Sequence, residues 1–134
     1  SLFDEKYEEL TGLLTPEMTA MEQLLFLNRE LFHMIEDSIS LDLLARLYST
    51  QLTTNGEKHL LDHNRIYYKL LRKIIAKGQA EGQLSSRSNV NEMVKLYALC
   101  ERALLYDWCL CAGEYALTEY SAKVLPGFLS SFLP

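Results

Sequence analysis

The stretch Val90–Gly113, VNEMVKLYALCERALLYDWCLCAG, decides what kind of fold this chain can form. Its apolar side chains recur at helical spacing, but they surround the helix axis instead of forming a single stripe. A helix that is apolar on all sides must be covered on all sides, and a chain of 134 residues offers only a limited core of its own. We therefore predict a helix here that packs into the domain and also against a second copy of the chain.

The same helical spacing recurs along the rest of the chain and predicts an all-α fold of about six helices in an antiparallel bundle. No alternating run of β-branched residues suggests a strand. Thr15 and either Ser38 or Ser40 are candidate helix N-caps, Gly82 should end a helix in the left-handed conformation, and Pro126 should kink or split the last helix. The expected helices cover residues 2–14, 16–37, 41–53, 58–81, 90–113 and 115–133, within a single domain of residues 1–134.

The last two expected helices, residues 90–133, should form a four-helix interface with the same helices of a partner copy. The alternative is that the helix at 90–113 is only the central helix of a monomer. Soluble monomers rarely expose large apolar patches, which favours the dimer. The side chains that we expect at this interface are Val94, Leu105, Trp108, Tyr120, Val124 and Phe128.

Composition limits the classes of function. The formal net charge of −5 gives the chain no overall attraction for nucleic-acid phosphates. Its three cysteines all lie within residues 100–111, which is typical of a reduced, cytoplasmic protein that uses them as small core residues. Glu101 and Asp107 interrupt the apolar stretch, so we expect no membrane span, and no signal peptide is visible.

The sequence contains no complete catalytic or metal-binding motif. His59 and His63 have the spacing of two metal ligands on one helix face, but no third ligand is evident, so we predict no metal site. Cys109 and Cys111 read CxC and not the CxxC of redox proteins. Phosphate-binding, dinucleotide-binding and nucleophile-elbow motifs are absent from the sequence. We predict a protein that is not an enzyme and uses no cofactor.

Polar side chains on the apolar helix faces indicate a ligand pocket between the second and fifth expected helices, because such pockets are apolar with a few convergent polar groups. Each candidate also has a purely structural interpretation. Asn28 could make an internal hydrogen bond between helices, Tyr48 and Tyr67 could be core aromatics, and Glu101 could pair across the dimer interface. The residues that we expect to line the pocket are Asn28, Phe32, Tyr48, His63, Tyr67, Leu71, Tyr97 and Glu101.

The segment Lys69–Leu84, KLLRKIIAKGQAEGQL, followed by a polar turn and a long apolar helix carrying Trp108, resembles the C-terminal region of the TetR family of transcriptional regulators. The Gly78–Gly82 phrase is its most specific part. The opening residues 1–14 resemble the helix that leaves the DNA-binding head in such proteins. The resemblance implies a homodimeric repressor or activator that changes its grip on DNA when a small-molecule effector binds.

The resemblance also implies an N-terminal helix-turn-helix head, through which DNA would be bound, and nothing in this acidic chain matches one. We expect that head to be missing, and the start at Ser1 also suggests a fragment of a longer protein. Two other functions compete with ligand sensing: a ligand-free helical adaptor that docks another protein, and a small helical enzyme. A hollow on the order of several hundred Å³ would favour the sensor, and solid packing would favour the adaptor.

Overall fold

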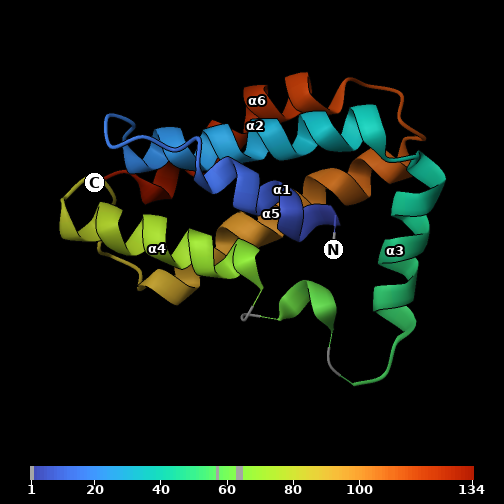
Figure 1. The fold of residues 1–134 in the computed structure, drawn as a ribbon, viewed down its shortest axis with the longest axis horizontal. Coiled ribbons are helices and arrows are strands. Elements are labelled where there is room, and N and C mark those ends of the chain that lie inside the picture. Colours follow the sequence, from blue (N-terminus) through green and yellow to red (C-terminus); the bar gives the residue numbers. More distant parts are fainter. Residues whose placement is uncertain (1, 57, 63–64) are drawn as a thin grey trace.

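The computed structural model describes residues 2–56, 58–62 and 65–134. These residues form α-helices and short 3-10 helices, without a strand among them, which confirms the predicted all-α class (Figure 1). The elements are α1 (Leu2–Thr11), α2 (Ala20–Ser38), α3 (Leu41–Thr53), η1 (His59–Leu61), α4 (Ile66–Ala80), α5 (Val90–Leu110), α6 (Leu117–Phe128) and η2 (Ser130–Phe132).

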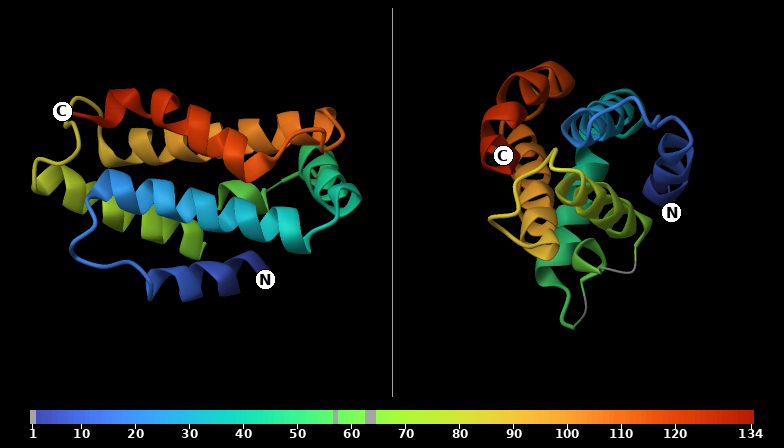
Figure 2. Two further views of the ribbon diagram at one scale, coloured as in Figure 1. Left: turned by 90° about the horizontal axis from the view of Figure 1, so that it is seen from above. Right: turned by 90° about the vertical axis from the view of Figure 1, so that its left-hand side faces the viewer.

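The long helices α2, α4, α5 and α6 run in alternating directions along the longest axis of the molecule and form the predicted antiparallel bundle (Figures 1 and 2). α2 packs against both α4 and α6, and α4 packs against α5. α3 crosses one end of this bundle, and α1 lies against α2 and α4 on the side away from α6. The core therefore lies around α2, and the end crossed by α3 is closed by shorter elements.

The start of α2 differs from the prediction. The helix begins at Ala20 and not at residue 16, because Thr19 forms a reciprocal capping box with Glu22: each side chain accepts a hydrogen bond from the backbone N–H of the other. Thr15, the expected cap, instead accepts a turn hydrogen bond from Met18. The prediction was wrong because a threonine followed by proline is a weaker start signal than a complete capping box.

The fourth helix is also shorter than predicted. Residues 59–61 form the separate 3-10 turn η1, and α4 begins only at Ile66. The backbone N–H of Leu60 donates to the side chain of Gln51 at 3.0 Å, which ties η1 to α3. The apolar period of α4 begins at Ile66, and none of the residues of η1 is buried, so η1 has no apolar face that would favour a continuous helix.

The turn at Gly78–Leu84, which contains the GQAEG phrase, ends α4. Gly82 has φ +73°, as predicted. The N–H of Gln83 donates to the carbonyl of Gly78 at 2.8 Å, and that of Gly82 to Gln79 at 3.2 Å, which is a Schellman ending for α4. The Gln83 side chain then accepts the N–H of Ala20 at 2.9 Å. The turn therefore joins the end of α4 to the start of α2.

Gly78 permits this close approach. A Cβ at this position would lie 2.7 Å from the Cβ of Ala20 and 2.7 Å from a methyl carbon of Leu84, which is closer than real side chains come. The amide of Gln79 donates to the carbonyls of Ser85 and Ser88 at 3.1 and 2.7 Å and so organises the polar turn that follows. The role of this phrase in the described structure is to shape the fold.

The last helix begins with a cap supplied by another helix. Glu36 of α2 accepts hydrogen bonds from the N–H groups of Leu117 and Thr118 at 2.8 and 2.7 Å, and also from the Thr118 hydroxyl. Burial by itself would raise the pKa of Glu36, but these hydrogen bonds outweigh it and lower that pKa. α6 then ends two residues beyond Pro126, and η2 follows separately, so residues 115–133 are divided as the proline predicts.

Candidate functional site

A buried hydrogen-bond network lies at the centre of the molecule. Glu101 of α5 is 3% exposed, and it accepts hydrogen bonds from the Tyr67 hydroxyl of α4 at 2.6 Å and from the Asn28 amide of α2 at 2.9 Å. Ser121 of α6 donates to the amide oxygen of Asn28 at 2.6 Å. The network therefore joins all four long helices and satisfies polar groups that would be costly to bury alone.

Glu101 has an unusual electrostatic environment. Burial raises the pKa of this carboxyl, while the hydrogen bonds from Tyr67 and Asn28 and the charge of Arg102 act in the opposite direction. Burial, together with the nearby Glu101 carboxylate, raises the pKa of Tyr67. Tyr67 therefore stays a hydroxyl donor at neutral pH, and the Glu101 oxygens are already occupied by two donors.

A cavity of about 60 Å³ adjoins one side of this network. It has room for a few water molecules or a very small organic molecule, which is well below the several hundred Å³ expected for a sensor. Side chains from α1 to α5 and from η1 surround it, and it is partly open to the outside. The residues that line it are Phe3, Tyr7, Leu31, Ile35, Leu44, Leu47, Tyr48, Leu60, Arg65, Tyr67, Ala98, Glu101, Arg102 and Leu105.

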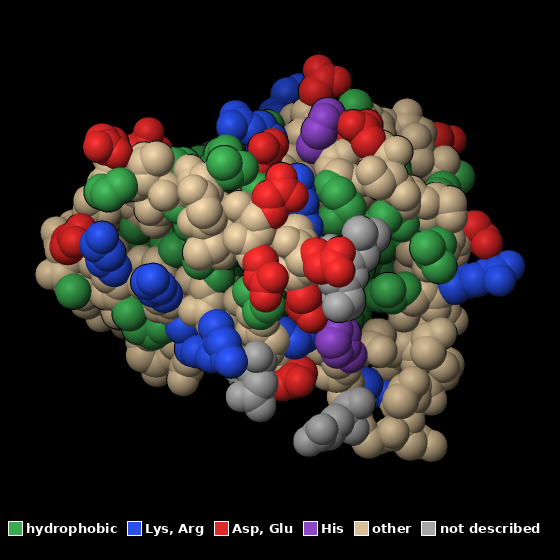
Figure 3. All heavy atoms as spheres, viewed as in Figure 1, with side chains coloured by type: hydrophobic (Ala, Val, Ile, Leu, Met, Phe, Trp, Pro, Cys, Tyr) green, Lys and Arg blue, Asp and Glu red, His purple; other side chains and the backbone are tan. Residues whose placement is uncertain are grey.

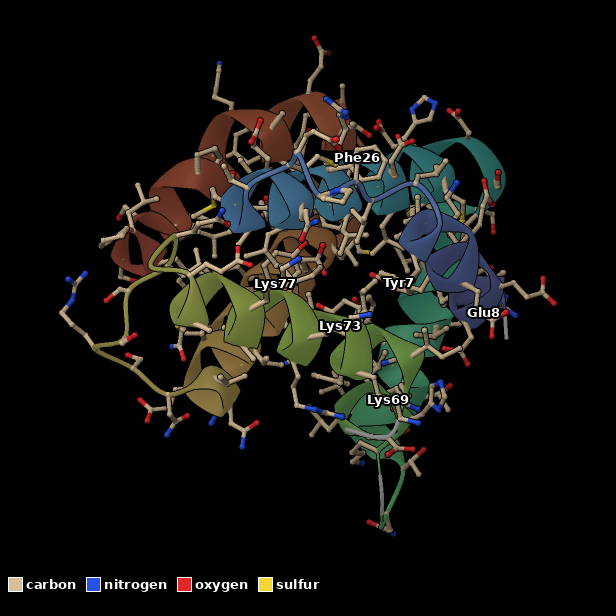
Figure 4. All side chains as sticks on the ribbon, turned by 60° about the vertical axis from the view of Figure 1, so that its left-hand side comes forward. Tyr7, Glu8, Phe26, Lys69, Lys73 and Lys77 are labelled. Atoms are coloured by element: carbon tan, nitrogen blue, oxygen red, sulfur yellow. The ribbon has the colours of Figure 1, made fainter. Side chains whose placement is uncertain are left out.

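Aromatic rings form much of the cavity wall. Tyr7 of α1 faces α4 (Figure 4), and its ring meets that of Tyr67 edge-on with centroids 5.0 Å apart. Burial raises the pKa of Tyr7, and the Glu101 carboxylate nearby raises it further. Neither the hydroxyl of Tyr7 nor that of Tyr48 makes a hydrogen bond with another described residue. Both hydroxyls are therefore available to a bound molecule.

A second hollow lies on the other side of Tyr48. It is an open groove between α3 and the end of α5, with a volume of about 260 Å³. Tyr48 lines both this groove and the inner cavity, so the two spaces adjoin each other at this residue. The residues around the groove are Ala45, Tyr48, Ser49, Leu52, Tyr106, Cys109 and Leu110.

The residues predicted to line a pocket differ in where the structure places them. Tyr48, Tyr67 and Glu101 line the cavity. Asn28 and Tyr97 lie behind it, where Asn28 makes the predicted hydrogen bond between helices and the Tyr97 hydroxyl donates to the carbonyl of Leu24 at 2.7 Å.

Two further predicted pocket residues, Phe32 and Leu71, are fully buried core residues away from the cavity wall. His63 lies outside the described residues. The sequence interpretation also missed Tyr7, Arg65 and Arg102, although all three line the cavity. Arg65 immediately precedes α4, and its side chain lines the cavity and does not continue the exposed row of Lys69, Lys73 and Lys77 on that helix.

The basic outer side of α4 lies away from the cavity. Lys69, Lys73 and Lys77 follow one another along this helix (Figure 4), and all three are exposed. Figure 3 shows basic side chains gathered over α4 and acidic ones over the neighbouring α1. The two helices therefore present neighbouring surfaces of opposite charge. Both surfaces are exposed to water, as is usual for charged side chains.

The outer side of α5 and α6 carries an apolar face. The two helices lie side by side, opposite α1 (Figure 2). On α5, the side chains of Leu99, Tyr106 and Leu110 are 50%, 52% and 67% exposed. On α6, Tyr120 and Phe128 are 42% and 50% exposed, and Val124 is half-buried. We call these six residues the apolar outer face.

Val94, Leu105 and Trp108, which were expected at a dimer interface, are instead buried within the chain itself. α2, α3, α4 and α6 cover more of α5 than its all-round apolar pattern suggested, because the bundle wraps around this helix. Leu105 lines the cavity, and the indole N–H of Trp108 donates to the carbonyl of Tyr115 at 2.9 Å. Tyr120, Val124 and Phe128 remain on the outer face.

Comparisons with protein-family models, with curated proteins and with solved structures found no match to this chain. None of the helices in the described residues is long and apolar enough to cross a membrane. Within the same residues, no three potential metal ligands lie close enough together to hold an ion.

Proposed function

We propose that this chain is the ligand-sensing and dimerisation domain of a TetR-like transcriptional regulator, in which a small molecule bound in the cavity causes a separate head to release DNA. The observation that carries the proposal is the cavity itself. It brings polar groups of α1, α3, α4 and α5 to one apolar space beside a fully connected buried network. Convergent polar groups in an apolar hollow are what a small-molecule site requires.

The order of the helices supports the same proposal. The GQAEG phrase ends α4, a polar turn follows, and the long apolar α5 carries Trp108, as in the family that the sequence resembles. α1 contributes Tyr7 to the cavity wall. Because α1 corresponds in that resemblance to the helix leaving the head, a ligand that moves Tyr7 would act on the connection to DNA.

Binding is a better proposal than catalysis for this cavity. Among the described residues that line it, none is a serine, threonine, cysteine, lysine or histidine. The carboxylate of Glu101 is held by two donors, so it is poorly placed to act as a general base.

The apolar outer face supports the dimerisation part of the proposal. Its residues recur at spacings of four and seven positions, one or two helical turns, on two adjacent helices, and all except the half-buried Val124 are exposed. Pairing this face with that of a second copy would form a four-helix interface and remove the apolar side chains from water.

Sedimentation equilibrium tests the dimer. We expect the chain to be a dimer at micromolar concentration, and we expect Leu99→Glu with Tyr106→Glu to yield a folded monomer. Leu43→Glu is the matched control, because Leu43 is 57% exposed on α3, away from the outer face, and its replacement should leave the dimer intact. A monomeric parent chain at high concentration would contradict this part of the proposal.

The small volume of the cavity favours one alternative, a ligand-free helical module that dimerises and docks another protein. The gene upstream of the Ser1 codon separates the two functions. A basic helix-turn-helix encoded there would support the regulator, and its absence would support the adaptor.

A further inference from the structure

Two guanidinium groups of the cavity wall have no ionic partner among the residues that the structure describes. Arg65 immediately precedes α4, and Arg102 lies on α5 next to Glu101. Both side chains are half-buried, and neither forms an ion pair with a described residue. Two partly desolvated cations beside an apolar space are a costly arrangement unless they bind something.

Tyr68 holds both groups in position. The guanidinium of Arg65 lies 6.0 Å from the centre of the Tyr68 ring and 5.6 Å from that of Tyr67. The Arg102 Nη1 donates to the Tyr68 hydroxyl at 3.1 Å, and this hydroxyl donates to the Leu60 carbonyl at 2.7 Å. One aromatic side chain therefore contacts both cations.

One donor in this cluster is buried without an acceptor. The Nη1 of Arg65 makes a long hydrogen bond of 3.5 Å to the Leu60 carbonyl, but its Nε has no partner. An unsatisfied buried donor is costly, so an acceptor placed here would be bound favourably. The free hydroxyls of Tyr7 and Tyr48 lie on the same cavity and can donate to the same molecule.

The charge balance of the wall is positive. Glu101 is the single carboxylate among the described lining residues, and Tyr67 and Asn28 already donate to it. Even with Glu101 ionised, two cations face one anion. α4 also begins at this point without a side-chain cap, so its first N–H groups and the positive end of its dipole add to the same potential.

We propose that the cavity binds a small organic carboxylate, with its carboxylate group between Arg65 and Arg102 and its apolar part against Leu31, Ile35 and Leu44. This inference rests on the proposed function, since it names the chemical class of the effector. The fork of a guanidinium matches a carboxylate in geometry and charge. An amine of similar shape would meet two cations and only one hydrogen-bonded carboxylate.

The size of the cavity limits the apolar part. As described, the space accepts only a very small group, and a larger molecule must displace Tyr48 towards the groove between α3 and α5. α3 has a single buried residue, Leu44, so this displacement disturbs little packing. The expected ligand is therefore a short-chain or single-ring acid.

The test compares molecules that differ only in their charged group. Thermal unfolding and titration calorimetry are performed with benzoate, benzyl alcohol and benzylamine, and with hexanoate, 1-hexanol and hexylamine. We expect a saturable rise in melting temperature with at least one of the two acids and none with the matched alcohol or amine. Arg65→Gln and Arg102→Gln should each weaken acid binding about tenfold or more, because each removes a charge-assisted hydrogen bond.

Two further variants separate binding from folding. Arg65→Lys keeps the charge but not the fork, and should lose less affinity than Arg65→Gln. Arg46→Gln is the matched control, since Arg46 pairs with Asp42 on the exposed side of α3, and it should bind the acid unchanged. Circular dichroism confirms that each variant keeps its helix content.

The outcomes distinguish this inference from the function on which it rests. If an amine or an alcohol binds and the acids do not, or if Arg65→Gln binds the acid as well as the parent, the carboxylate inference is overturned while ligand sensing stands. If none of the compounds, and none of a broad set of small apolar and aromatic molecules, raises the melting temperature at millimolar concentration, both the inference and the sensing function are overturned.

Discussion

The two ends of the bundle differ in how tightly they are packed. At the end formed by the Gly78–Leu84 turn and the start of α2, the side chains of Ala20 and Leu84 lie so close to Gly78 that a Cβ there would come within 2.7 Å of both. At the opposite end, α3 buries only Leu44, and the cavity opens between α1, α3, η1 and the start of α4. Elements that move to admit ligands are usually drawn from the less stable parts of a fold. The end with the Gly78–Leu84 turn is therefore the stable end of the bundle, and the end crossed by α3 is the one that we propose to bind a ligand.

The largest expected loss of stability comes from a substitution at the tightly packed end of the bundle. Gly78→Ala should lower the free energy of unfolding by about 2 kcal/mol, because the added methyl group overpacks the contact with Ala20 and Leu84 and this outweighs the better helix propensity of alanine. Urea unfolding measures the change. Gly127→Ala is the matched control: it is also in a helix, but no atom lies within 4 Å of its Cβ position, so we expect a gain of up to about 1 kcal/mol. Equal losses for both variants would contradict the close packing at Gly78.

Two tyrosines that line the cavity should differ in how much their hydroxyl groups contribute to stability. Tyr67→Phe should cost about 1–2 kcal/mol, because it removes a donor to the buried Glu101 carboxylate. Tyr48→Phe should change the free energy of unfolding by less than about 0.5 kcal/mol, since its hydroxyl makes no hydrogen bond with the described residues and lines open space. Chemical denaturation of both variants in one buffer decides the ordering, and a larger loss for Tyr48→Phe would reverse our assignment.

The smallest expected effect concerns the cap of α6 and depends on pH. The pKa of Glu36 is lower in the folded chain than its usual value of 4.5, so its contribution to stability is present above that pH and is lost as the pH falls below it. Glu36→Gln should therefore cost about 1 kcal/mol at pH 7 and progressively less below pH 4.5. Unfolding curves measured across this range provide the test.

Ser40→Ala supplies the comparison for this cap. Ser40 is a local N-cap: its hydroxyl accepts a hydrogen bond from the N–H of Leu43 in the first turn of α3, at 3.1 Å. Its removal should also cost about 1 kcal/mol, but without the change below pH 4.5 that a carboxylate produces. A pH-independent loss for Glu36→Gln would show that its charge does not contribute to the cap.

Part of the candidate site could be predicted from the sequence. Asn28 and Glu101 are polar residues on apolar helix faces, and a buried polar group must find a partner, so an internal network was foreseeable. Tyr7 and Arg65 were not, because each belongs to a short or irregular segment whose neighbours depend on how the helices cross. Leu105 shows the same limit: its apolar character suited either a dimer interface or a cavity, and the packing of α3 against α5 placed it in the cavity.

The sequence by itself determined the all-α class, the order of the helices and some of their ends, such as the end of α4 at Gly82. These features follow from local chemistry: helical periodicity, side-chain caps and the conformational freedom of glycine. Only the tertiary structure decided which sides of α5 are covered by this chain and which remain as the apolar outer face. It also decided that Arg65 and Arg102 line the same cavity, because contacts between distant segments depend on the packing of whole helices and leave no local signal in the sequence.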